Sequence, residues 1–457
     1  MPSRTEIAAF RFGYGLPAIG PVEPEPLVAC LAGPDPAAAL WPAHGTAEVL
    51  QNLKQIREAR AAGQAAAGDA TAMAQADAAL AAAHDGNRAL YTQAARASFA
   101  RAVGSATPFR ERMVAFWADH FTTTSRNQTQ LAWASALVEE AIRPYLSGRF
   151  ATLLQAVTLH PAMLIYLDQS ASVGPTSRRG AKRGEGLNEN LARELLELHT
   201  LGVDAGYTQQ DVRETAQLLT GLTVVPERGG FVFDPSRVEP GADTILGTAY
   251  DGRGTAPILQ ALQDLSVRPE TARHLARKLA VHFVSDDPEP ALVAALEAEW
   301  LRSGGDLSAV TLVLTSHRAA RAAEPGKARQ PFDFLVAAMR ALGVPADQIH
   351  GMETKPFGGQ LMGRLKRMGQ DWQRAPGPDG WPEAAAAWIT PHGMAARIDW
   401  ALAVPQRMLA ELPDPREFAI QALGSRADAA LRLAVSRSES RREAIALVLA
   451  SPAFNRR

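Results

Sequence analysis

The sequence predicts an all-α protein with a large multi-helix, bundle-like architecture, one small β-hairpin and a long Ala-rich helical arm. Most of the 457-residue chain consists of amphipathic stretches of helical period, separated by short breaks that contain Pro or Gly. One segment is dominated by Ala, and only one pair of β-rich runs flanks a Gly-Gly turn. At 47% hydrophobic and 21% charged residues, the chain can bury a sizeable core.

The first two segments differ in composition from the rest of the chain. Residues 1–46 are rich in Pro and Gly and are predicted to form an N-terminal wrapping segment with short helical turns. Residues 47–104 are rich in Ala, which has the highest helix propensity, and predict a helical hairpin arm with breaks near 63–68 and 85–87. Because this arm has few large apolar side chains, it is either a structural projection or a binding arm.

Residues 105–457 are predicted to form the main helical domain. Its expected helices cover residues 110–121, 131–146, 150–167, 187–201, 208–221, 270–283, 290–302, 307–320 and 331–342, followed by closing helices after residue 392. Thr208 is a candidate N-cap with Asp211 three residues later, and Gly221 marks the end of that helix. The hairpin is expected at 222–234, a basic loop at 170–187 and a Trp/Pro loop at 368–391.

Three apolar helices resemble one another at their ends. In each of the segments 153–162, 310–317 and 445–454 an apolar helix ends at a Ser or His, and Pro follows that residue in two of them. Pro is favoured at the first position of a helix, so these segments predict reused helix–elbow–helix units.

Charge and cysteine usage exclude several classes of protein. The formal net charge is −1, which argues against a dedicated nucleic-acid binder. Cys30 is the only cysteine, so no intramolecular disulfide and no cysteine-rich metal site is expected. The apolar run at 27–32 is too short for a membrane span, and no secretory signal precedes it. These features predict a cytoplasmic location.

The expected helix at 187–201 has an unusual polar face. At about 100° per residue, one arc carries two carboxylates, an amide and a guanidinium, and the opposite side is apolar. The polar arc consists of Asn190, Arg193, Glu194 and Glu197, and the other side of Leu191, Leu195, Leu198 and His199. A grouping of this kind is typical of a polar site.

The two carboxylates of this arc predict acid–base chemistry. Glu194 and Glu197 lie one turn apart, so in a partly buried cleft one of them would be pushed toward protonation. His120 is expected to face them across a helix interface, which makes these three the candidate catalytic residues. The candidate binding residues are Asn188, Asn190, Arg193, Asp211 and Arg213. Alternatively, the same side chains form a buried polar network that holds helices together.

A divalent metal is an alternative cofactor for the same residues. One histidine nitrogen and two carboxylate groups, from His120, Glu194 and Glu197, would suit a hard or borderline ion. The chain has no His-Glu-x-x-His motif, and nothing else in it indicates a cofactor.

A series of motifs in fixed order extends over almost the whole chain. In the first half these are 11–15, 111–121, 161–168, 188–190, 199–202, 207–214 and 219–221. In the second half they are Lys278-Leu279, His282-Phe283, Gln330-Pro331-Phe332, Gly369-Gln370, Gly380-Trp381-Pro382 and 451–454. In this order the chain resembles the bacterial family catalogued as domain of unknown function 1800.

The resemblance implies a mostly helical bacterial protein. Relatives are often encoded beside a sulfatase-like or phosphatase-like exported protein, and many carry export signals, which implies a periplasmic location as the alternative. The chain departs from the family at three positions: Val238 and Asp243 stand where relatives often have His and Lys, and Ala118 stands where many have a second His beside His120. Chemistry that used those side chains in relatives would be lost or altered here.

Two functional hypotheses follow. The first is an acid–base or metal-assisted hydrolase or lyase with its cleft on the 188–199 helix. The second is a non-catalytic partner or maturation factor for a neighbouring exported sulfatase-like protein. The Ala-rich arm, the Trp/Pro loop and the lack of a catalytic signature favour this second hypothesis.

Overall fold

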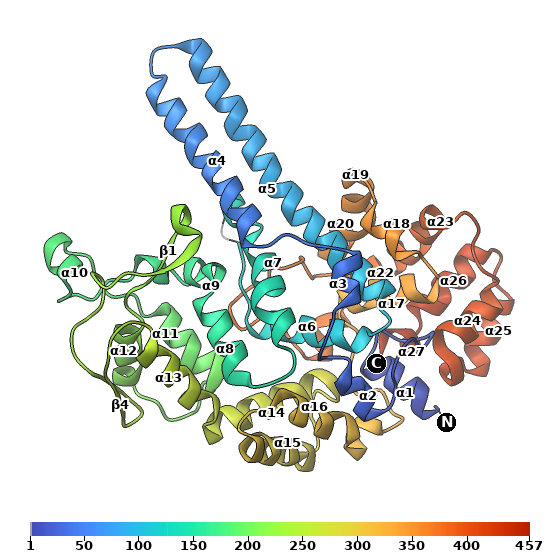
Figure 1. Ribbon diagram of the computed structural model, residues 1–457. Coiled ribbons are helices and arrows are strands. Elements are labelled where there is room, and N and C mark those ends of the chain that lie inside the picture. The colour runs from blue at the N-terminus through green and yellow to red at the C-terminus, as the bar shows by residue number, and fades with distance from the viewer. Residues whose placement is uncertain (1, 126) are drawn as a thin grey trace.

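Helices dominate the structure, as the sequence predicts. The computed structural model describes residues 2–125 and 127–457 (Figure 1). The first α-helices are α1 (Arg4–Arg11), α2 (Pro24–Ala29), α3 (Pro36–Leu40), α4 (Thr46–Ala65), α5 (Ala70–Gly104), α6 (Pro108–His120), α7 (Trp133–Leu137), α8 (Phe150–Leu159), α9 (Pro161–Tyr166), α10 (Arg178–Arg183), α11 (Asn190–Glu194) and α12 (Gln209–Leu218).

The second half of the chain continues in the same way. Its α-helices are α13 (Ala256–Ser266), α14 (Pro269–Phe283), α15 (Pro290–Ser303), α16 (Leu307–Ser316), α17 (Pro331–Ala341), α18 (Ala346–His350), α19 (Thr354–Phe357), α20 (Gly363–Arg367), α21 (Ala385–Trp388), α22 (Pro391–Ala403), α23 (Pro405–Met408), α24 (Pro415–Leu423), α25 (Ala429–Ser436), α26 (Arg441–Ala450) and α27 (Pro452–Asn455).

Short 3₁₀ and π segments and two small sheets join these helices. The π-helical segments are η2 (Val138–Ile142), η5 (Leu195–Thr200) and η8 (Gly358–Met362). The 3₁₀ segments are η1 (Gln128–Gln130), η3 (Arg143–Tyr145), η4 (Gln169–Ala171), η6 (Pro226–Arg228), η7 (Arg318–Arg321) and η9 (Gly424–Arg426). The antiparallel sheets pair β1 (Leu222–Val225) with β2 (Gly230–Phe233) and β3 (Asp243–Ile245) with β4 (Thr248–Tyr250).

Local capping explains many of the helix boundaries. Thr208 and Asp211 form the predicted capping box at the start of α12. The three predicted elbows are also present: the side chains of His160, His317 and Ser451 each accept a hydrogen bond from a backbone N–H in the first turn of the segment that follows. The elbow residues therefore end one helix and cap the next.

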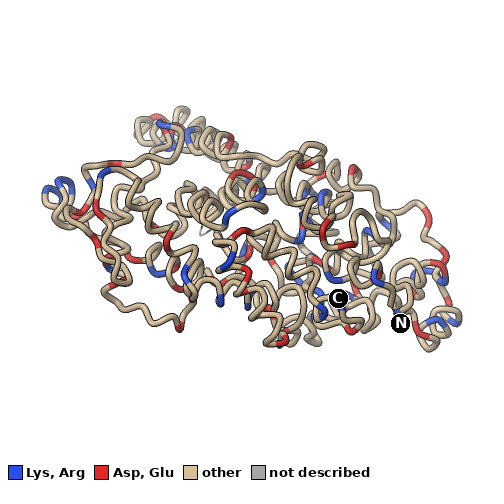
Figure 2. Tube along the Cα trace, turned by 60° about the horizontal axis from the view of Figure 1, so that its bottom comes forward, with Lys and Arg blue, Asp and Glu red and all other residues tan. Residues whose placement is uncertain are grey.

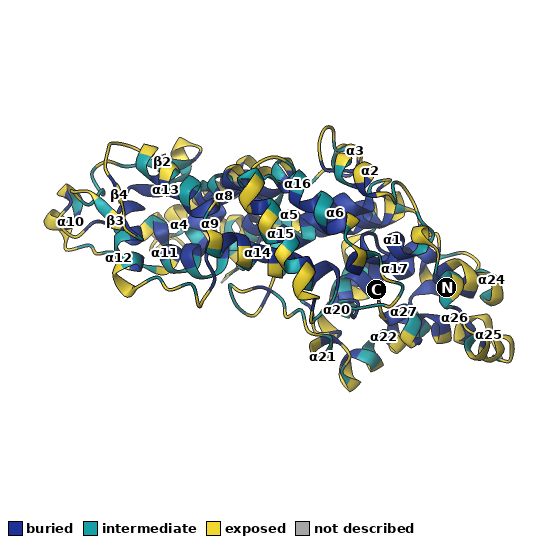
Figure 3. Cartoon of the chain, turned by 90° about the horizontal axis from the view of Figure 1, so that it is seen from below, coloured by how far each residue is buried: buried dark blue, intermediate teal, exposed yellow. Residues whose placement is uncertain are grey.

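The hydrophobic interior of the described chain consists of two large clusters. The first, which we call core 1, is built from side chains between Ala8 and Ala320 and includes Trp117 and Trp300. The second, core 2, combines α5 with the C-terminal helices and includes Phe99 and Trp400. Helices such as α6 and α14 are buried along most of one side (Figure 3). The junction between the two cores lies beside α6.

Helices α4 and α5 pack along each other and project from the body as the predicted arm (Figure 1). The predicted break near 63–68 is confirmed, because α4 ends at Ala65 and α5 begins at Ala70. The break expected at 85–87 is wrong: α5 continues through it. Gly86 faces Asn52 of α4, where an added Cβ would come within 2.8 Å of the amide nitrogen. Gly86 therefore allows the two helices to pack closely without ending the helix.

Two further segments differ from the sequence prediction. The basic loop expected at 170–187 contains the short helix α10, which Ser177 caps at its start and Gly184 ends in a left-handed conformation. The sheet β3–β4 is additional to the predicted hairpin and packs against α12. Acidic and basic residues are interspersed along the chain (Figure 2). No described helix combines the length and the apolar composition that a bilayer span requires.

Candidate active site

A cavity of about 160 Å³ lies at the junction between core 1 and core 2. Its walls come from α5, α6, η2, α14, α17 and the Trp/Pro loop, which are far apart in the sequence. The polar side chains that line it are Tyr14, Ser98, Glu111, Arg112, Asp119, Thr122, Thr123, Arg143, His282, Gln330, Asp333, Gln370 and Gln373, and its largest apolar ones are Phe332, Trp372 and Trp381. Such a mixture of aromatic and convergent polar groups is typical of a small-molecule site.

Helices α6 and α14 bring two rows of ionisable side chains together. On α6, Arg112 and Asp119 are seven residues apart and therefore lie on one face. On α14, Lys278 follows His274 and precedes His282 at four-residue spacing, so these three also share a face. The rows meet where Arg112 Nη2 lies 3.2 Å from His282 Nε2. We call these two rows the α6–α14 charge ladder.

One end of the ladder is a fully paired ionic cluster. Arg112 forms an ion pair with Asp333, which also lies 3.3 Å from Nε of Arg457. These two arginines hold the pKa of Asp333 below its usual value, although burial acts in the opposite direction. Removing only one partner of such a buried ion pair strongly destabilises a protein, because the other charge is left buried and unpaired.

His282 connects this cluster to the Trp/Pro loop. Its Nδ1 lies 2.5 Å from Oε1 of Glu383. Since a guanidinium only donates, Nε2 accepts from Arg112, and Nδ1 carries the proton toward Glu383. Burial lowers the pKa of His282 to about 4, in agreement with a neutral ring. The loop is thereby fastened to α14 next to the cavity.

Asp119 is the carboxyl group at the other end of the ladder. The backbone N–H of Trp381 donates to its Oδ1 over 2.9 Å. Gly380 has φ +86° and approaches so closely that an added Cβ would lie 2.8 Å from both carboxylate oxygens. Burial raises the pKa of Asp119 to about 7, and the hydrogen bond from Trp381 counteracts this only in part. Near neutral pH this carboxyl can therefore both give and take a proton.

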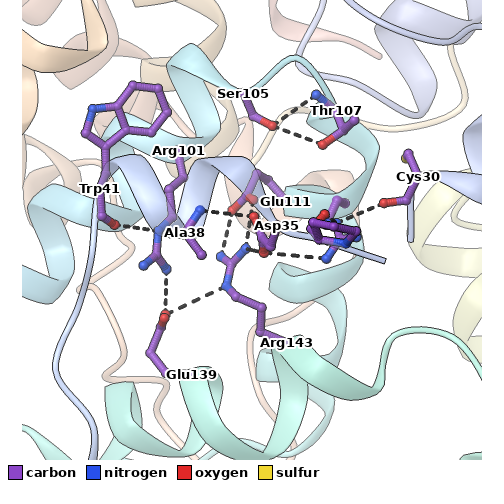
Figure 4. Close-up of polar contacts among 12 residues, drawn as sticks. Cys30, Asp35, Ala38, Trp41, Arg101, Ser105, Thr107, Glu111, Glu139 and Arg143 are labelled. Atoms are coloured by element: carbon purple, nitrogen blue, oxygen red, sulfur yellow. Dashed lines mark hydrogen bonds and ion pairs between the residues drawn. The ribbon is translucent and has the colours of Figure 1, made fainter. Parts of the chain in front are cut away.

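A second buried ionic network includes Glu111 and Arg143, which line the cavity (Figure 4). Arg143 binds both carboxylate oxygens of Glu111, at 2.9 and 2.8 Å, and also reaches Asp35 at 2.8 Å. Arg101 pairs with Glu139 at 2.6 Å and donates to the carbonyl of Trp41 at 2.8 Å. Because each of these buried arginines is paired with at least one carboxylate, this network supports the cavity wall.

The sequence-predicted carboxylates lie on the neighbouring helix α11 and on η5. Glu194 is half-buried, and its pKa is raised to about 7 by burial and by the nearby charges of Glu197 and Asp379. Asp379 also influences the pKa of Asp119. Neither Glu194 nor Glu197 lines the cavity. The charge of Asp379 on the Trp/Pro loop therefore contributes to the raised pKa of both carboxyls, Asp119 and Glu194.

The predicted binding residues are scattered around α11 and α12. Arg193 lies 3.4 Å from both Glu189 and Glu197, and it donates to Gln209 of α12 over 3.0 Å. Asn188 caps the chain before α11 by accepting from the backbone N–H of Asn190, which is itself exposed.

Two more predicted binding residues belong to α12. Asp211 completes the capping box of this helix and accepts from the N–H of Leu246 over 2.7 Å. Arg213 is exposed. The departures from the family pattern lie nearby: Asp243 begins β3, and Val238 packs beside Gly221. None of these four residues lines the cavity.

His120 does not meet Glu194 or Glu197 in any described hydrogen bond. It is buried, and its Nε2 lies 3.3 Å from the carbonyl oxygen of His199. Burial, together with Lys278 and two other histidines, lowers its pKa. Among the described residues, no three His, Cys, Asp or Glu side chains are arranged to hold a metal ion.

The sequence interpretation missed the residues of the charge ladder. Arg112, Asp119, Lys278 and His282 all occur in the motifs that carry the family resemblance, but the polar arc drew attention to 188–199 instead. The four-residue spacing of His274, Lys278 and His282 was a detectable signal, because it places ionisable groups on the inner face of an otherwise amphipathic helix.

Comparison with known proteins gives one match. The family model described as "Protein of unknown function (DUF1800)" matches residues 30–456, nearly the whole chain. No curated protein and no solved structure matches.

Proposed function

The chain belongs to the DUF1800 family of proteins of unknown function, and we propose that it is an acid–base enzyme, a hydrolase or lyase, whose substrate occupies the cavity between the two cores. The observation that carries this proposal is the carboxyl of Asp119. It lines the cavity, and its pKa is raised to about 7. Strongly perturbed carboxyls in clefts are characteristic of catalytic acids and bases.

The proposed chemistry uses Asp119 as the group that transfers a proton to or from the substrate. General acids and bases work best when their pKa lies near the operating pH, and such catalysis contributes roughly 10²–10⁴-fold. Glu194 supplies a second carboxyl with a pKa of about 7, to which the charge of Asp379 also contributes. The proposed site therefore includes Asp119 in addition to the sequence-predicted residues Glu194, Glu197 and His120, and Asp119 is its principal acid.

The remaining walls suit an organic substrate. Trp381 and Phe332 provide flat apolar surfaces, and Trp381 is held in place by the hydrogen bond of its backbone to Asp119. Gln370 is already engaged with Gln330 and with the backbone N–H of Phe332, so it shapes the cavity. Enclosure between two cores would exclude water during proton transfer.

The test is a search for turnover that depends on Asp119. Purified protein is incubated with a bacterial metabolite extract, and compounds that disappear or accumulate are identified by mass spectrometry. We expect Asp119→Asn to abolish each change, while the exposed control Arg432→Gln on α25 retains it. An extract that wild type leaves unaltered, or that Asp119→Asn alters equally, would contradict the proposal.

Metal assistance remains part of this proposal through the pair Glu194 and Glu197. Elemental analysis of the purified chain tests it directly: a stoichiometric divalent metal that is lost in Glu194→Gln supports a metal-assisted mechanism. If the purified chain contains no stoichiometric metal and still shows turnover, only the acid–base mechanism without metal remains.

The α4–α5 arm favours a second candidate function, that of a partner or maturation factor for a sulfatase-like protein encoded nearby. The arm projects from the body (Figure 1), and Met73 near its tip is 45% exposed. Co-purification with that neighbour, from wild type and from a chain with residues 60–78 replaced by a short turn, tests this role. Loss of a stable complex only in the shortened chain supports it, and absence of a complex with wild type at micromolar concentration refutes it.

A further inference from the structure

Tyr14 is a buried tyrosine of the cavity wall whose hydroxyl group has no partner in the described chain. The residue is 3% exposed, and it lines the cavity together with Arg112 and Asp333. Among the residues that the structure describes, none forms a hydrogen bond with the Tyr14 hydroxyl oxygen. A buried tyrosine hydroxyl usually finds a hydrogen-bond partner, so this unused donor requires an explanation.

Two other tyrosines of the chain use their hydroxyl groups within the protein. The hydroxyl of Tyr91 donates to the carbonyl oxygen of Trp372 over 2.6 Å. The hydroxyl of Tyr250 donates to a carboxylate oxygen of Asp264 over 3.1 Å. Tyr14 differs from both, because it lines the cavity and its hydroxyl has no acceptor among the described residues.

The Tyr14 hydroxyl is also not sealed by the packing around it. The unpaired Nη1 and Nη2 atoms of Arg329 show the opposite case, because protein atoms cover both of them almost completely. The hydroxyl oxygen of Tyr14 does not belong to this group of covered atoms and keeps an accessible surface. Since Tyr14 lines the cavity, that surface is open to a molecule bound there.

Tyr14 lies near the paired end of the charge ladder. Its ring centroid is 5.5 Å from the guanidinium carbon of Arg112. Asp119 follows Arg112 by seven residues on α6, which is about 10 Å along the helix axis. Tyr14 and Asp119 therefore line one cavity at different positions along α6, so that one small molecule can contact both.

The charges that line the cavity favour an uncharged partner for this hydroxyl. Arg112 is paired with Asp333 and Arg143 with Glu111, so each arginine of the described lining already has a carboxylate. A bound carboxylate or phosphate would therefore add a buried negative charge without a free cation to pair it. Burial, together with Asp333, raises the pKa of Tyr14, so its hydroxyl stays protonated and donates.

We propose that Tyr14 is a substrate-binding residue whose hydroxyl donates a hydrogen bond to a carbonyl oxygen of an uncharged organic substrate. This inference rests on the proposed acid–base function and names the substrate class of that site. The aromatic side chains of the cavity suit the carbon skeleton of such a molecule, and Asp119 exchanges the proton. The donor that the protein leaves unused thereby orients the substrate.

A pair of probes with nearly equal shape tests this proposal on the full-length chain. Acetophenone carries a carbonyl oxygen, and isopropenylbenzene has a CH₂ group in its place. Binding of each probe is measured by calorimetry for wild type, for Tyr14→Phe and for Tyr250→Phe, the matched control whose hydroxyl bonds to Asp264 away from the cavity.

We expect Tyr14→Phe to weaken the binding of acetophenone roughly two- to tenfold, which corresponds to one net hydrogen bond, and to leave the binding of isopropenylbenzene unchanged. Tyr250→Phe should change neither affinity. Equal weakening of both probes in Tyr14→Phe would mean that only the shape of the cavity has changed, and this would overturn the proposal. Unaltered binding of acetophenone to Tyr14→Phe, or no binding to wild type at millimolar concentration, would overturn it as well.

Infrared spectroscopy reports the hydrogen bond directly. The carbonyl stretching frequency of ¹³C-labelled acetophenone should be lower in the complex with wild type than in the complex with Tyr14→Phe, because a hydrogen bond to the oxygen weakens the carbonyl bond. The control Tyr250→Phe should give the frequency of wild type. Equal frequencies in wild type and Tyr14→Phe would contradict a bond from this hydroxyl.

Stability measurements separate a binding role from a structural one. Tyr14→Phe should leave the denaturation midpoint unchanged, whereas Tyr91→Phe loses the bond to Trp372 and should lower it. An equal lowering in both variants would assign the Tyr14 hydroxyl to the fold and overturn the proposal. None of these readouts needs turnover, so they can fail while Asp119-dependent conversion is found, and they can succeed where no conversion is found.

Discussion

The polar arc of α11 and the α6–α14 charge ladder are built from the same kinds of side chain but in different surroundings. In the arc, Arg193 bridges Glu189 and Glu197 along one helix at 3.4 Å, at positions that stay partly exposed. In the ladder, Arg112 meets Asp333 and His282, which come from two other helices, and all three are buried. The same pairing is therefore local and weak in one region and long-range and strong in the other.

This difference shows that a sequence reveals polar clusters within one helix more readily than clusters formed between helices. Neighbours on one helix are visible from their spacing, whereas Arg112, His282 and Asp333 are joined only after the chain has folded. The stability and the chemistry of each region depend on how far its charges are buried, and four substitutions test this difference between the arc and the ladder.

The largest effect is expected at the buried end of the ladder. Arg112→Met should destabilise the chain by about 3–5 kcal/mol, because Asp333 would lose one of its two arginine partners inside the protein. Chemical denaturation measures this change. The double variant Arg112→Met/Asp333→Leu should lose less than the sum of the two single variants. Strict additivity would mean that the pair is not coupled.

Asp119→Asn should have the next largest effect on the free energy of unfolding, and it should stabilise the chain. A carboxyl whose pKa rises from 3.8 to about 7 on folding lowers stability progressively as pH rises through that interval, and the penalty is constant above it. The asparagine variant should therefore be more stable than wild type by roughly 2–4 kcal/mol at pH 8 and by less at pH 5. Thermal unfolding at the two pH values checks this. An equal shift at both would contradict the raised pKa.

Glu194→Gln links the two regions. The pKa of Glu194 is raised to about 7 by burial first and by Glu197 next, but the side chain is partly exposed. We expect a gain in stability at pH 8 that is smaller than for Asp119→Asn, together with loss of any Asp119-dependent turnover. A marked loss of stability without loss of turnover would instead identify the arc as a structural network.

The smallest effect is expected at Arg193. Removing its two partly exposed ion pairs in Arg193→Ala should cost about 0–1 kcal/mol, and the cost should shrink further at high salt. Denaturation in low and high salt provides the measurement. A loss comparable with that of Arg112→Met would show that the arc and the ladder are energetically alike, which would remove the basis of the comparison.

Local patterns determined most of the helical architecture. The capping box of Thr208 and Asp211, the elbows at His160, His317 and Ser451, and the hairpin around Gly229-Gly230 depend on contacts within a few residues, so their sequences were sufficient. The errors arose where tertiary packing competes with local propensity. Gly86 remains helical because α4 lies against it, and the pairing of β3 with β4 was not apparent from a short, polar sequence.

The candidate site, too, could be predicted from the sequence only in part. From the sequence alone one can identify the helices that carry Asp119 and Lys278 and the motifs that contain them. Only the tertiary structure could decide that Asp119 lines the cavity and that burial raises the pKa of Asp119 while it lowers the pKa of Lys278. The physical reason is that desolvation depends on how much of the surrounding chain is packed around a charge. The groups that act on Asp119, namely Trp381, Glu383, Lys278 and Asp379, are all more than a hundred residues away from it in the sequence.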